Sequence, residues 1–475
     1  MSRPVEAIMI GAGQRGTEAY GPYALQHPDD LRFVAVAEPQ AARRARFAQA
    51  HHIPPQRQFH TWEELLAQPP MAEAALVCTL DHLHVGPAAA ALEAGYDVLL
   101  EKPMATTLPD CLRLVQTAER TGRILMICHV LRTTDFFTKV HEIVTSGRLG
   151  DVITVEHREN VAYWHMAHSY VRGNWRHSQT ASPMILAKCC HDLDILFWNL
   201  GPVRRLSSFG SLSHYRAENA PPGAPERCTD GCPHEDTCPW HAPRLYLEII
   251  PLMQAARQAR SPAQRLAASL YLDHRRIVEL TRRLIPPLDG LLDYRGWPIS
   301  AISEDSSPAA RLQALQSGPY GRCVYRCDND VVDHQTVNME FESGITGVLT
   351  MHGHADEEAR TMRYDGTRAT LRGKFAMMGF QITLHDHRTG QMETIAPPGT
   401  LRGHGGGDAA LLAAFVRTVR QGQADPLTSA RASLESHLLA FAAEQSRLQG
   451  GAVVEMDAYR RKVEAPTLTR QANPV

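Results

Sequence analysis

The segment Ala7-Ile8-Met9-Ile10-Gly11-Ala12-Gly13-Gln14-Arg15-Gly16 decides the fold, because it joins a buried apolar strand directly to a glycine-rich turn. The turn fits the pattern G-x-G-x-x-G, in which glycines allow a tight bend and bring backbone N–H groups close to a pyrophosphate. The pattern therefore predicts a dinucleotide-binding loop at the start of a helix. The candidate cofactor contacts in this loop are Gly11, Gly13, Gln14, Arg15 and Gly16.

Short apolar runs continue at 33–36, 75–78 and 98–100, and they are typical of strands buried on both faces of a parallel sheet. Helical patterns separate them. We predict these helices at about 15–24, 40–51, 62–67, 86–95 and 109–121. The alternation of strand and helix indicates an α/β fold, with an N-terminal Rossmann domain of doubly wound parallel sheet over residues 1–127.

The second half of the chain, residues 128–475, has a different pattern. Apolar and polar residues alternate at 151–157, 337–341, 347–352 and 382–385, as in antiparallel strands with one buried face, and Glu342-Ser343-Gly344 is a hairpin turn between two of them. Helices are expected at about 407–421 and 430–448. This predicts an α+β domain with one large sheet, interrupted by a Cys-bearing insertion at about 215–320 with helical stretches near 244–258 and 262–283.

Composition excludes several classes of protein. The 475 residues are 44% hydrophobic, enough for a core, and 49 basic residues against 51 acidic ones leave no excess charge for nucleic acid. Charged residues interrupt every apolar stretch before the 18 or so residues that a membrane span requires. Met1-Ser2-Arg3-Pro4 leads straight into the first strand without room for a signal peptide, so we expect a cytoplasmic protein with no membrane partner.

Two charged residues follow predicted strands. Glu38 lies 22 residues after Gly16, where a carboxylate accepts hydrogen bonds from a ribose 2′-OH and repels a 2′-phosphate, so NAD is favoured over NADP. Arg43 and Arg44 leave NADP as the less favoured alternative, and a solvated strand-end Glu38 remains the other interpretation. Lys102 follows the strand ending at Leu100, and there an ammonium can stabilise oxygen charge during hydride transfer.

Two motifs around these residues resemble a known family. Thr79-Leu80-Asp81-His82-Leu83-His84 resembles its "T-P-N-x-x-H" segment, and Ala91 to Pro103 resembles "A-L-E-A-G-K-H-V-L-x-E-K-P". The chain resembles the Gfo/Idh/MocA oxidoreductases over about 1–215 and 320–455. The resemblance implies a Rossmann domain, a large, mostly antiparallel sheet, NAD(P), a sugar or cyclitol substrate and a homo-oligomer. It implies further cofactor contacts at Thr79, Asp81, His84, Glu101 and Lys102.

The family's third motif, roughly "D-x-G-x-H-x-x-D", falls on Ala187 to Asp194, where His191 and Asp194 match but Ala187 and Cys189 replace the leading acid and the glycine. On a helix, Lys188, His191 and Asp192 would share one face. A neutral His191 then accepts the hydroxyl proton, Lys188 holds an oxygen or lowers the pKa of His191, and Asp194 orients the imidazole. A core or capping histidine is the alternative. The candidate catalytic residues are Lys102, Lys188, His191 and Asp194.

The segment 159–176 interleaves aromatic side chains with hydrogen-bonding ones, as a carbohydrate subsite requires. In this interpretation Arg172 and Arg176 hold a carboxylate; alternatively, the aromatics only seal a domain junction. Arg132 lies where the family often has a site arginine. The candidate substrate contacts are Arg132, Tyr163, Trp164, His165, Arg172, Trp175, Asp192 and His404.

Half of the ten cysteines lie in two short loops, Cys228-x3-Cys232-x5-Cys238 and Cys323-x3-Cys327. Four thiolates can form a structural zinc site, although the spacing is not the C-x2-C of common zinc ribbons. Buried thiols and disulfides remain alternatives, so the sequence assigns no metal.

These observations favour an NAD(P)-dependent oxidoreductase that moves a hydride from a secondary hydroxyl of a sugar, sugar acid or cyclitol to nicotinamide. One alternative is an NAD-dependent redox glycosidase, which oxidises, eliminates, hydrates and re-reduces its substrate. The other is a non-catalytic dinucleotide-sensing regulator.

Overall fold

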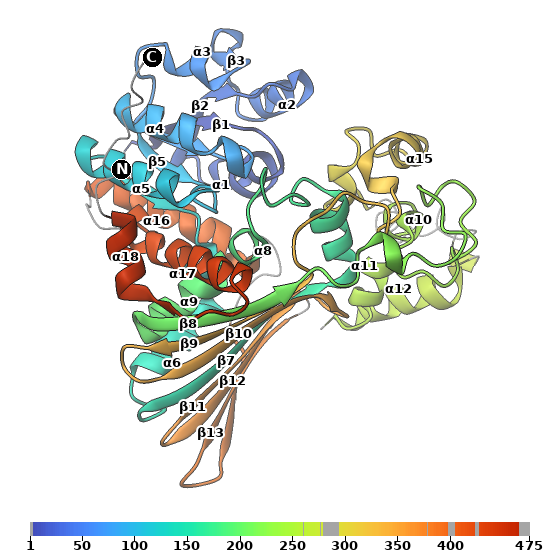
Figure 1. Cartoon of the computed structure of the whole chain (residues 1–475). Coiled ribbons are helices and arrows are strands. Elements are labelled where there is room, and N and C mark those ends of the chain that lie inside the picture. Colours follow the sequence, from blue (N-terminus) through green and yellow to red (C-terminus); the bar gives the residue numbers. More distant parts are fainter. Residues whose placement is uncertain are drawn as a thin grey trace, which may run out of the picture.

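The structure is a computed structural model that describes residues 3–259, 261–275, 277–278, 294–377, 379–397, 404–422 and 427–464. Two sheets organise it, with a helical insertion beside them (Figure 1). Among the described residues, the helices are too short or too polar to cross a membrane.

The first sheet has six parallel strands in the order β3-β2-β1-β4-β5-β6, which confirms the predicted Rossmann domain. Its strands are β1 (Val5–Ile10), β2 (Leu31–Ala37), β3 (Gln58–Phe59), β4 (Ala74–Val77), β5 (Asp97–Leu100) and β6 (Leu125–Ile127). Its helices are α1 (Gly21–Gln26), α2 (Ala41–Ala50), α3 (Trp62–Leu66), α4 (Val85–Glu93) and α5 (Leu108–Thr121). The helix expected at 15–24 begins instead as a π-helical turn, η1 (Arg15–Tyr20), that continues into α1.

Local sequence sets the helix ends in this domain. The hydroxyl of Thr61 accepts the Glu64 backbone N–H, and the Glu64 carboxylate binds back to Thr61, so α3 begins with a capping box. The Thr107 hydroxyl accepts the Asp110 N–H at the start of α5, and Gly122, at φ +65°, ends that helix. These caps fix where the loops that follow β3 and β5 end.

The second sheet has nine strands in the order β14-β13-β12-β11-β7-β10-β9-β8-β15. Every neighbouring pair is antiparallel except β7 with β10, so the prediction of a mostly antiparallel sheet is confirmed. The strands are β7 (Val152–Ala162), β8 (Val203–Ser211), β9 (His334–Phe341), β10 (Thr346–Ala355), β11 (Ala359–Gly366), β12 (Ala369–Ala376), β13 (Gly379–Asp386), β14 (Met392–Ile395) and β15 (Val454–Glu455). Gly344, at φ +86°, makes the predicted turn between β9 and β10.

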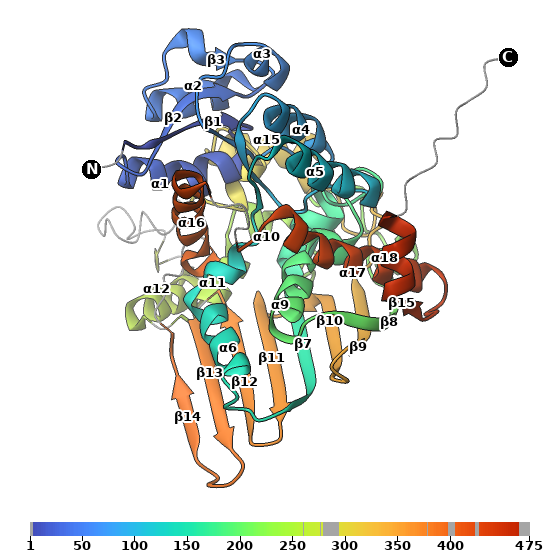
Figure 2. The ribbon, with the colours of Figure 1, turned by 90° about the vertical axis from the view of Figure 1, so that its left-hand side faces the viewer.

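Helices from the second half lie between the two sheets (Figure 2). They are α6 (Asp135–Thr145), α8 (Met184–Ala187), α9 (Cys190–Leu200), α16 (Gly407–Gln421), α17 (Ala430–Leu448) and α18 (Met456–Glu464). The C-terminal helices return to the Rossmann domain, since α16 contacts β1 and α17 contacts α5 and β6. The backbone N–H of Ile127 also donates to Thr428 O at 2.9 Å, so the first sheet is tied to the chain's C-terminal part.

The insertion lies between β8 and β9 and stands beside the large sheet (Figure 1). It contains α10 (Ala242–Tyr246), α11 (Ile250–Ala256), α12 (Pro262–Asp273) and α15 (Pro308–Ser317), and it has a hydrophobic cluster of its own. The helix expected at 262–283 is α12 as far as Asp273; residue 276 and residues 279–283 of that prediction lie outside the described residues.

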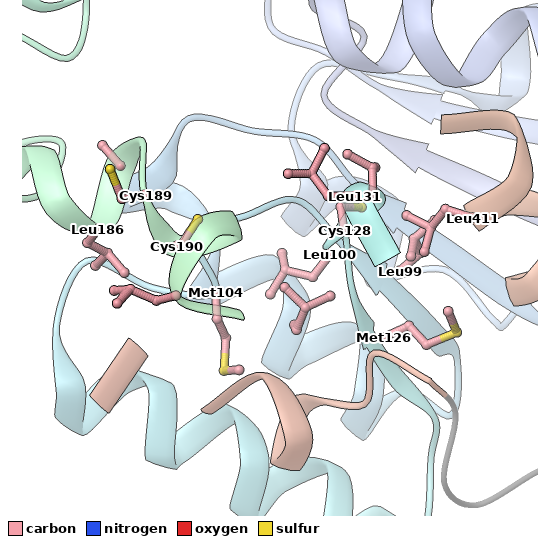
Figure 3. Close-up of a cluster of buried hydrophobic side chains, with 14 of the residues drawn as sticks. Leu99, Leu100, Met104, Met126, Cys128, Leu131, Leu186, Cys189, Cys190 and Leu411 are labelled. Carbon is pink, nitrogen blue, oxygen red and sulfur yellow. The ribbon is translucent and has the colours of Figure 1, made fainter. Parts of the chain in front are cut away.

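A buried cluster joins the two domains where the candidate site begins (Figure 3). It has Leu100 of β5 and Cys128, just after β6, on one side and Cys189 and Cys190, at the start of α9, on the other, with Met104 between them, and all five are at most 1% exposed. Lys102 follows Leu100 by two residues and His191 follows Cys190 directly, so this packing fixes both side chains relative to one another.

Candidate functional site

The glycine loop after β1 has the shape that a dinucleotide needs. Gly11 has φ +92°, and a Cβ there would stand 2.7 Å from the Cys78 carbonyl oxygen; one at Gly16 would overlap the Gly11 carbonyl oxygen. Only glycine fits these two positions. At Gly13, by contrast, a Cβ would meet nothing nearer than the end of the Arg43 side chain at 4.0 Å. The loop therefore leaves its backbone open on the side where a pyrophosphate binds, and its residues fit NAD.

Glu38 lies at the end of β2 and is buried beside this loop. Its carboxylate accepts the backbone N–H groups of Ala12 at 2.9 Å and Gln40 at 3.0 Å. Arg44 donates to the backbone carbonyl of Glu38, so its guanidinium is tied to the main chain, while Arg43 extends toward Glu304 of the insertion at 3.9 Å. The negative charge of Glu38 is thus held in place next to the loop, as expected for a residue that prefers a ribose hydroxyl to a phosphate.

Arg15 and Glu101, both expected to contact the cofactor, form an internal ion pair instead. Arg15 Nε donates to Glu101 Oε1 at 2.5 Å and its Nη2 to Asp408 Oδ1 at 2.8 Å, and the Tyr20 hydroxyl donates to Glu101 at 2.6 Å. Burial opposes the charge of Glu101, but the Arg15 guanidinium outweighs it and keeps the pKa of this carboxyl below its ordinary value. The network fastens the glycine loop to α16.

The loop after β4 carries the other expected cofactor contacts, Thr79, Asp81 and His84. His84 Nδ1 lies 2.7 Å from Pro103 O and its Nε2 lies 3.2 Å from Thr79 O, so the ring joins this loop to the one that presents Lys102. Asp81 accepts the indole N–H of Trp175 at 3.0 Å, and burial raises the pKa of its carboxyl. Trp175 was expected at the substrate; its N–H instead ties the two domains together.

Lys102 and His191 lie together at the carboxyl edge of the Rossmann sheet. Lys102 Nζ donates to the Ala187 carbonyl oxygen at 3.0 Å. His191 is 4% exposed, and its ring lies between those of His129, at 5.6 Å between centroids, and His404, at 6.3 Å. Burial and then the charge of Lys102 lower the pKa of His191 well below its ordinary value, so its imidazole is neutral and one of its ring nitrogens carries no proton.

His129 and Asp408 are the site residues that the sequence analysis did not identify. His129 follows β6 and is fully buried, and the rule that placed Lys102 beyond a strand's carboxyl end applies to it equally. Asp408 lies 3.2 Å from His404 Nδ1 and also binds Arg15. Arg15, and then His404, hold the pKa of Asp408 far below its usual range against the opposing effect of burial. His404 is thereby fixed beside His191.

Asp194 and Arg132 bind each other, which corrects two predictions. The guanidinium of Arg132 donates twice to Asp194, from Nε and from Nη2, each at 2.7 Å, and its Nη1 donates to Leu427 O at 3.2 Å. Asp194 Oδ2 also lies 3.9 Å from His129 Nδ1. Asp194 therefore faces Arg132 and His129 and does not orient His191. Arg132 is a buried structural partner with all three nitrogens engaged, because two buried opposite charges are most stable when paired.

The single helix face expected for Lys188, His191 and Asp192 does not form. The helix breaks between them, since α8 ends at Ala187 and α9 begins at Cys190. Lys188 Nζ turns away to Glu358 at 2.6 Å and Glu159 at 3.2 Å. It is therefore not positioned to hold a reacting oxygen beside His191.

Asp192 belongs to the same buried charge network under the site. It accepts from His157 Nε2 at 2.7 Å and Arg360 Nε at 3.0 Å, and Arg360 also lies 2.8 Å from Glu159. Burial raises the pKa of Glu159 to about 7, although the charges of Arg360 and Lys188 oppose this rise. The sequence held a signal for this network: His157 and Glu159 occupy inward positions in the alternation of β7.

The aromatic segment after β7 faces the insertion. Trp164 is 3% exposed and packs against Trp297, with ring centroids 5.4 Å apart, and the Tyr163 hydroxyl binds Gln254 at 3.1 Å. His165 Nδ1 lies 2.9 Å from Glu358, and burial is the main cause that lowers the pKa of this histidine. The segment thus seals the insertion against the large sheet, as the alternative interpretation of the sequence held.

A cavity of about 200 Å³ remains beside this seal, and Lys102 and His191 are not among its lining residues. Tyr163, Trp164 and Glu358 line it together with α11. Arg172, expected to hold a substrate carboxylate, is instead buried and donates to the carbonyls of Arg322 at 2.7 Å and Trp240 at 2.8 Å. Arg176 binds Asp328 at 3.1 Å with a side chain that is 28% exposed, and its role toward a substrate carboxylate stays a prediction.

These features define a two-domain nucleotide-binding protein of the oxidoreductase type. The parallel sheet carries an open glycine loop and has a lysine and a neutral histidine at its carboxyl edge, and a nine-stranded sheet forms the second domain. Three family models match the chain. The NAD-binding Rossmann fold of the oxidoreductase family matches residues 5–129, and the GFO/IDH/MocA C-terminal domain matches 137–229. The oxidoreductase family's C-terminal alpha/beta domain matches 302–456. The chain belongs to the Gfo/Idh/MocA family.

Individual relatives match smaller parts of the chain. Inositol 2-dehydrogenase 2 of Saccharopolyspora erythraea is 33% identical over 131 residues, which are 27% of this chain and 35% of that protein. D-glucoside 3-dehydrogenase of Escherichia coli is 28% identical over 155 residues, which are 32% of this chain and 42% of that protein. The chain therefore spans less than half the length of the curated relatives it matches.

The solved structure of levoglucosan dehydrogenase in complex with NADH and levoglucosan shares the whole architecture. It superposes with a TM-score of 0.64 at 14% identity, over 96% of this chain and 100% of that one. Identity at this level shows a common fold only.

Proposed function

We propose that the protein is an NAD-dependent oxidoreductase that oxidises a secondary hydroxyl of a sugar, sugar acid or cyclitol. The observation that carries the proposal is that Lys102 lies close enough to the buried His191 for its charge to lower the pKa of the histidine, at the edge where the open glycine loop would bind a dinucleotide. The named activities of the relatives, on inositol and D-glucosides, support the substrate class.

Each of the two residues has one task in this reaction. His191 accepts the proton of the reacting hydroxyl, since burial and Lys102 keep its imidazole neutral. Lys102 places its ammonium near that oxygen and stabilises the negative charge that develops on it as the proton leaves. NAD, when bound, supplies the acceptor for the hydride. The buried surroundings keep bulk water from this edge, which strengthens both interactions.

Other residues hold this pair in position. Gly11, Gly13 and Gly16 bind the pyrophosphate, and Glu38 faces the ribose hydroxyls. His404, 40% exposed in its side chain and held by Asp408, stands between His191 and solvent and contacts the substrate. We assign Lys188 and Asp192 to support of the site, because their charges are paired with buried partners below it.

A redox glycosidase is the second candidate, and the cavity beside Tyr163 and Trp164 favours it. About 200 Å³ next to the sealed segment gives space for a sugar ring apart from the one at Lys102 and His191, which do not line this cavity, and a glycoside has such a second group where a free sugar lacks it. The insertion supplies part of that cavity through α11.

One assay distinguishes the two. The protein is incubated with NAD and matched panels of free sugars, cyclitols and chromogenic glycosides, and NADH and released aglycone are followed in the same wells. NADH that accumulates with a free sugar or cyclitol establishes the dehydrogenase. Aglycone released only in the presence of NAD, without net NADH, establishes the glycosidase. Neither product from any panel overturns both.

A further inference from the structure

Four cysteines from two distant segments of the chain line one small cavity at the edge of the insertion. They are Cys228, Cys232, Cys238 and Cys323, and all ten cysteines of the chain carry free thiols. Two backbone hydrogen bonds hold the two loops together: the Cys228 N–H donates to Gly321 O and the Cys323 N–H to Glu226 O, each at 2.9 Å. The proposed function uses none of these thiols.

The fifth cysteine of the two loops lies outside this group. The thiol of Cys327 donates to the Cys323 carbonyl oxygen at 3.3 Å, and Cys327 is not among the residues that line the cavity. The chain thus contains four converging thiols and a neighbouring thiol that serves as an internal comparison.

A buried cation faces the four thiols. Arg172 is 2% exposed and lines the same cavity, with Nη2 3.7 Å from Cys228 Sγ. It also donates to the carbonyl oxygens of Arg322 and Trp240 and interacts with the Tyr246 hydroxyl, and within the described ranges no carboxylate pairs with it. A buried guanidinium requires a nearby negative charge, which carbonyls and neutral thiols do not supply but metal-bound thiolates do. Arg172 therefore points to anionic sulfur in the cavity.

Zinc and iron–sulfur centres require different arrangements of their thiolate ligands. Thiolates around one zinc ion lie about 3.8 Å apart, because each Zn–S bond is about 2.3 Å long and the geometry is tetrahedral. In the part of the chain that the structure describes, no group of three or more His, Cys, Asp or Glu side chains is arranged to hold a metal ion. An iron–sulfur cluster binds each thiolate to a different iron, so it takes four cysteines that surround a larger core.

We propose that Cys228, Cys232, Cys238 and Cys323 bind an iron–sulfur cluster of the four-iron type, with Arg172 as its buried counter-charge. A cluster with four thiolate ligands carries net negative charge, which the guanidinium offsets. The centre connects the loops at 228–238 and 323 to the end of η5 (Met166–Arg172). That segment follows Tyr163 and Trp164, so the cluster fixes the insertion beside the cavity that these two residues line and takes no part in hydride transfer.

The test measures iron, acid-labile sulfide and zinc in protein purified without oxygen, for the wild-type chain and for Cys232→Ser, Cys238→Ser and the matched control Cys327→Ser. We expect about four iron and four sulfide per chain in the wild type and in Cys327→Ser. The visible absorption of the cluster should accompany them, and Cys232→Ser and Cys238→Ser should lose most of both. One zinc per chain without sulfide, or cluster retained in both Cys232→Ser and Cys238→Ser, overturns the proposal.

A second measurement applies even where a serine variant does not fold. Wild-type protein that has lost its metal in air is first treated with a thiol reductant, which is then removed. It is incubated without oxygen with equal amounts of ferrous and ferric iron and with sulfide, and its NAD affinity reports that it is folded. We expect iron and sulfide to return in equal amounts, about four each per chain. Folded protein that binds neither overturns the proposal, whatever substrate the enzyme acts on.

Discussion

Replacing Gly13 by alanine separates cofactor binding from folding more cleanly than any other change in the glycine loop. The added Cβ would meet nothing in the protein nearer than the Arg43 guanidinium at 4.0 Å, and Gly13 does not have a positive φ. We therefore expect the free energy of unfolding to change by less than about 0.5 kcal/mol. The methyl group occupies the open side of the loop, where the pyrophosphate must approach the backbone.

The expected loss of NAD affinity follows from that approach. One hydrogen bond between a backbone N–H and a charged phosphate contributes about 1.5–3 kcal/mol, so its loss weakens NAD binding by about 10- to 150-fold. Calorimetric titration with NAD measures the affinity, and urea unfolding measures the stability. Gly16→Ala is the matched control: its Cβ overlaps the Gly11 carbonyl oxygen, so this variant should lose stability as well as affinity. A stable Gly13→Ala variant that binds NAD as the wild type does would refute the assignment of the loop.

Three further outcomes are expected. Arg132→Met leaves the buried Asp194 carboxylate unpaired and should lower the free energy of unfolding, measured in urea, by about 3–5 kcal/mol, most of which Asp194→Leu should restore. A decrease below about 1 kcal/mol contradicts the pairing. His437 is buried neutral, and burial is the main cause that lowers its pKa from 6.5 to about 3. Its share of the stability is therefore complete above pH 6.5 and is lost as the pH falls toward 3, about 2 kcal/mol by pH 5; denaturation at several pH values should show a shallower decline in His437→Gln. For catalysis, kcat/KM should fall on the acid side with a midpoint below pH 6.5, and Lys102→Met should move that midpoint to higher pH, since removal of the cation raises the pKa of His191. A midpoint that does not move means that another group titrates there.

The Rossmann half of the fold was predictable because its signals are local. Strands buried on both faces are continuous apolar runs, and the glycines occupy positions where a side chain would collide with backbone. The large sheet was predicted as a class, but five of its strands, β8, β11, β12, β14 and β15, were not identified individually. In β11 the alternation is obscured, because the charged Arg360 occupies a buried position where it pairs with Asp192 and Glu159.

The candidate site was predictable at Lys102 and His191 and less so around them. Those two positions follow from strand ends and from motifs of contiguous residues. The partners of Arg132 and Lys188 do not, since Asp194 and Glu358 lie 62 and 170 residues further along the chain. The sequence around a charged side chain does not differ between a residue that binds a ligand and one that pairs with a buried opposite charge. Only the fold decides between them, and here it gave both side chains internal partners.

The measurement that tests the central claim most directly compares Lys102→Met and His191→Asn with the wild type, using NAD and the best substrate from the panel. Turnover and NAD affinity are determined on the same preparations. We predict that turnover falls by about 10²- to 10⁴-fold in each variant while NAD affinity changes by less than about threefold, because both residues act on the substrate hydroxyl. Turnover that survives in both variants would contradict the account, and it would place the chemistry of this protein elsewhere.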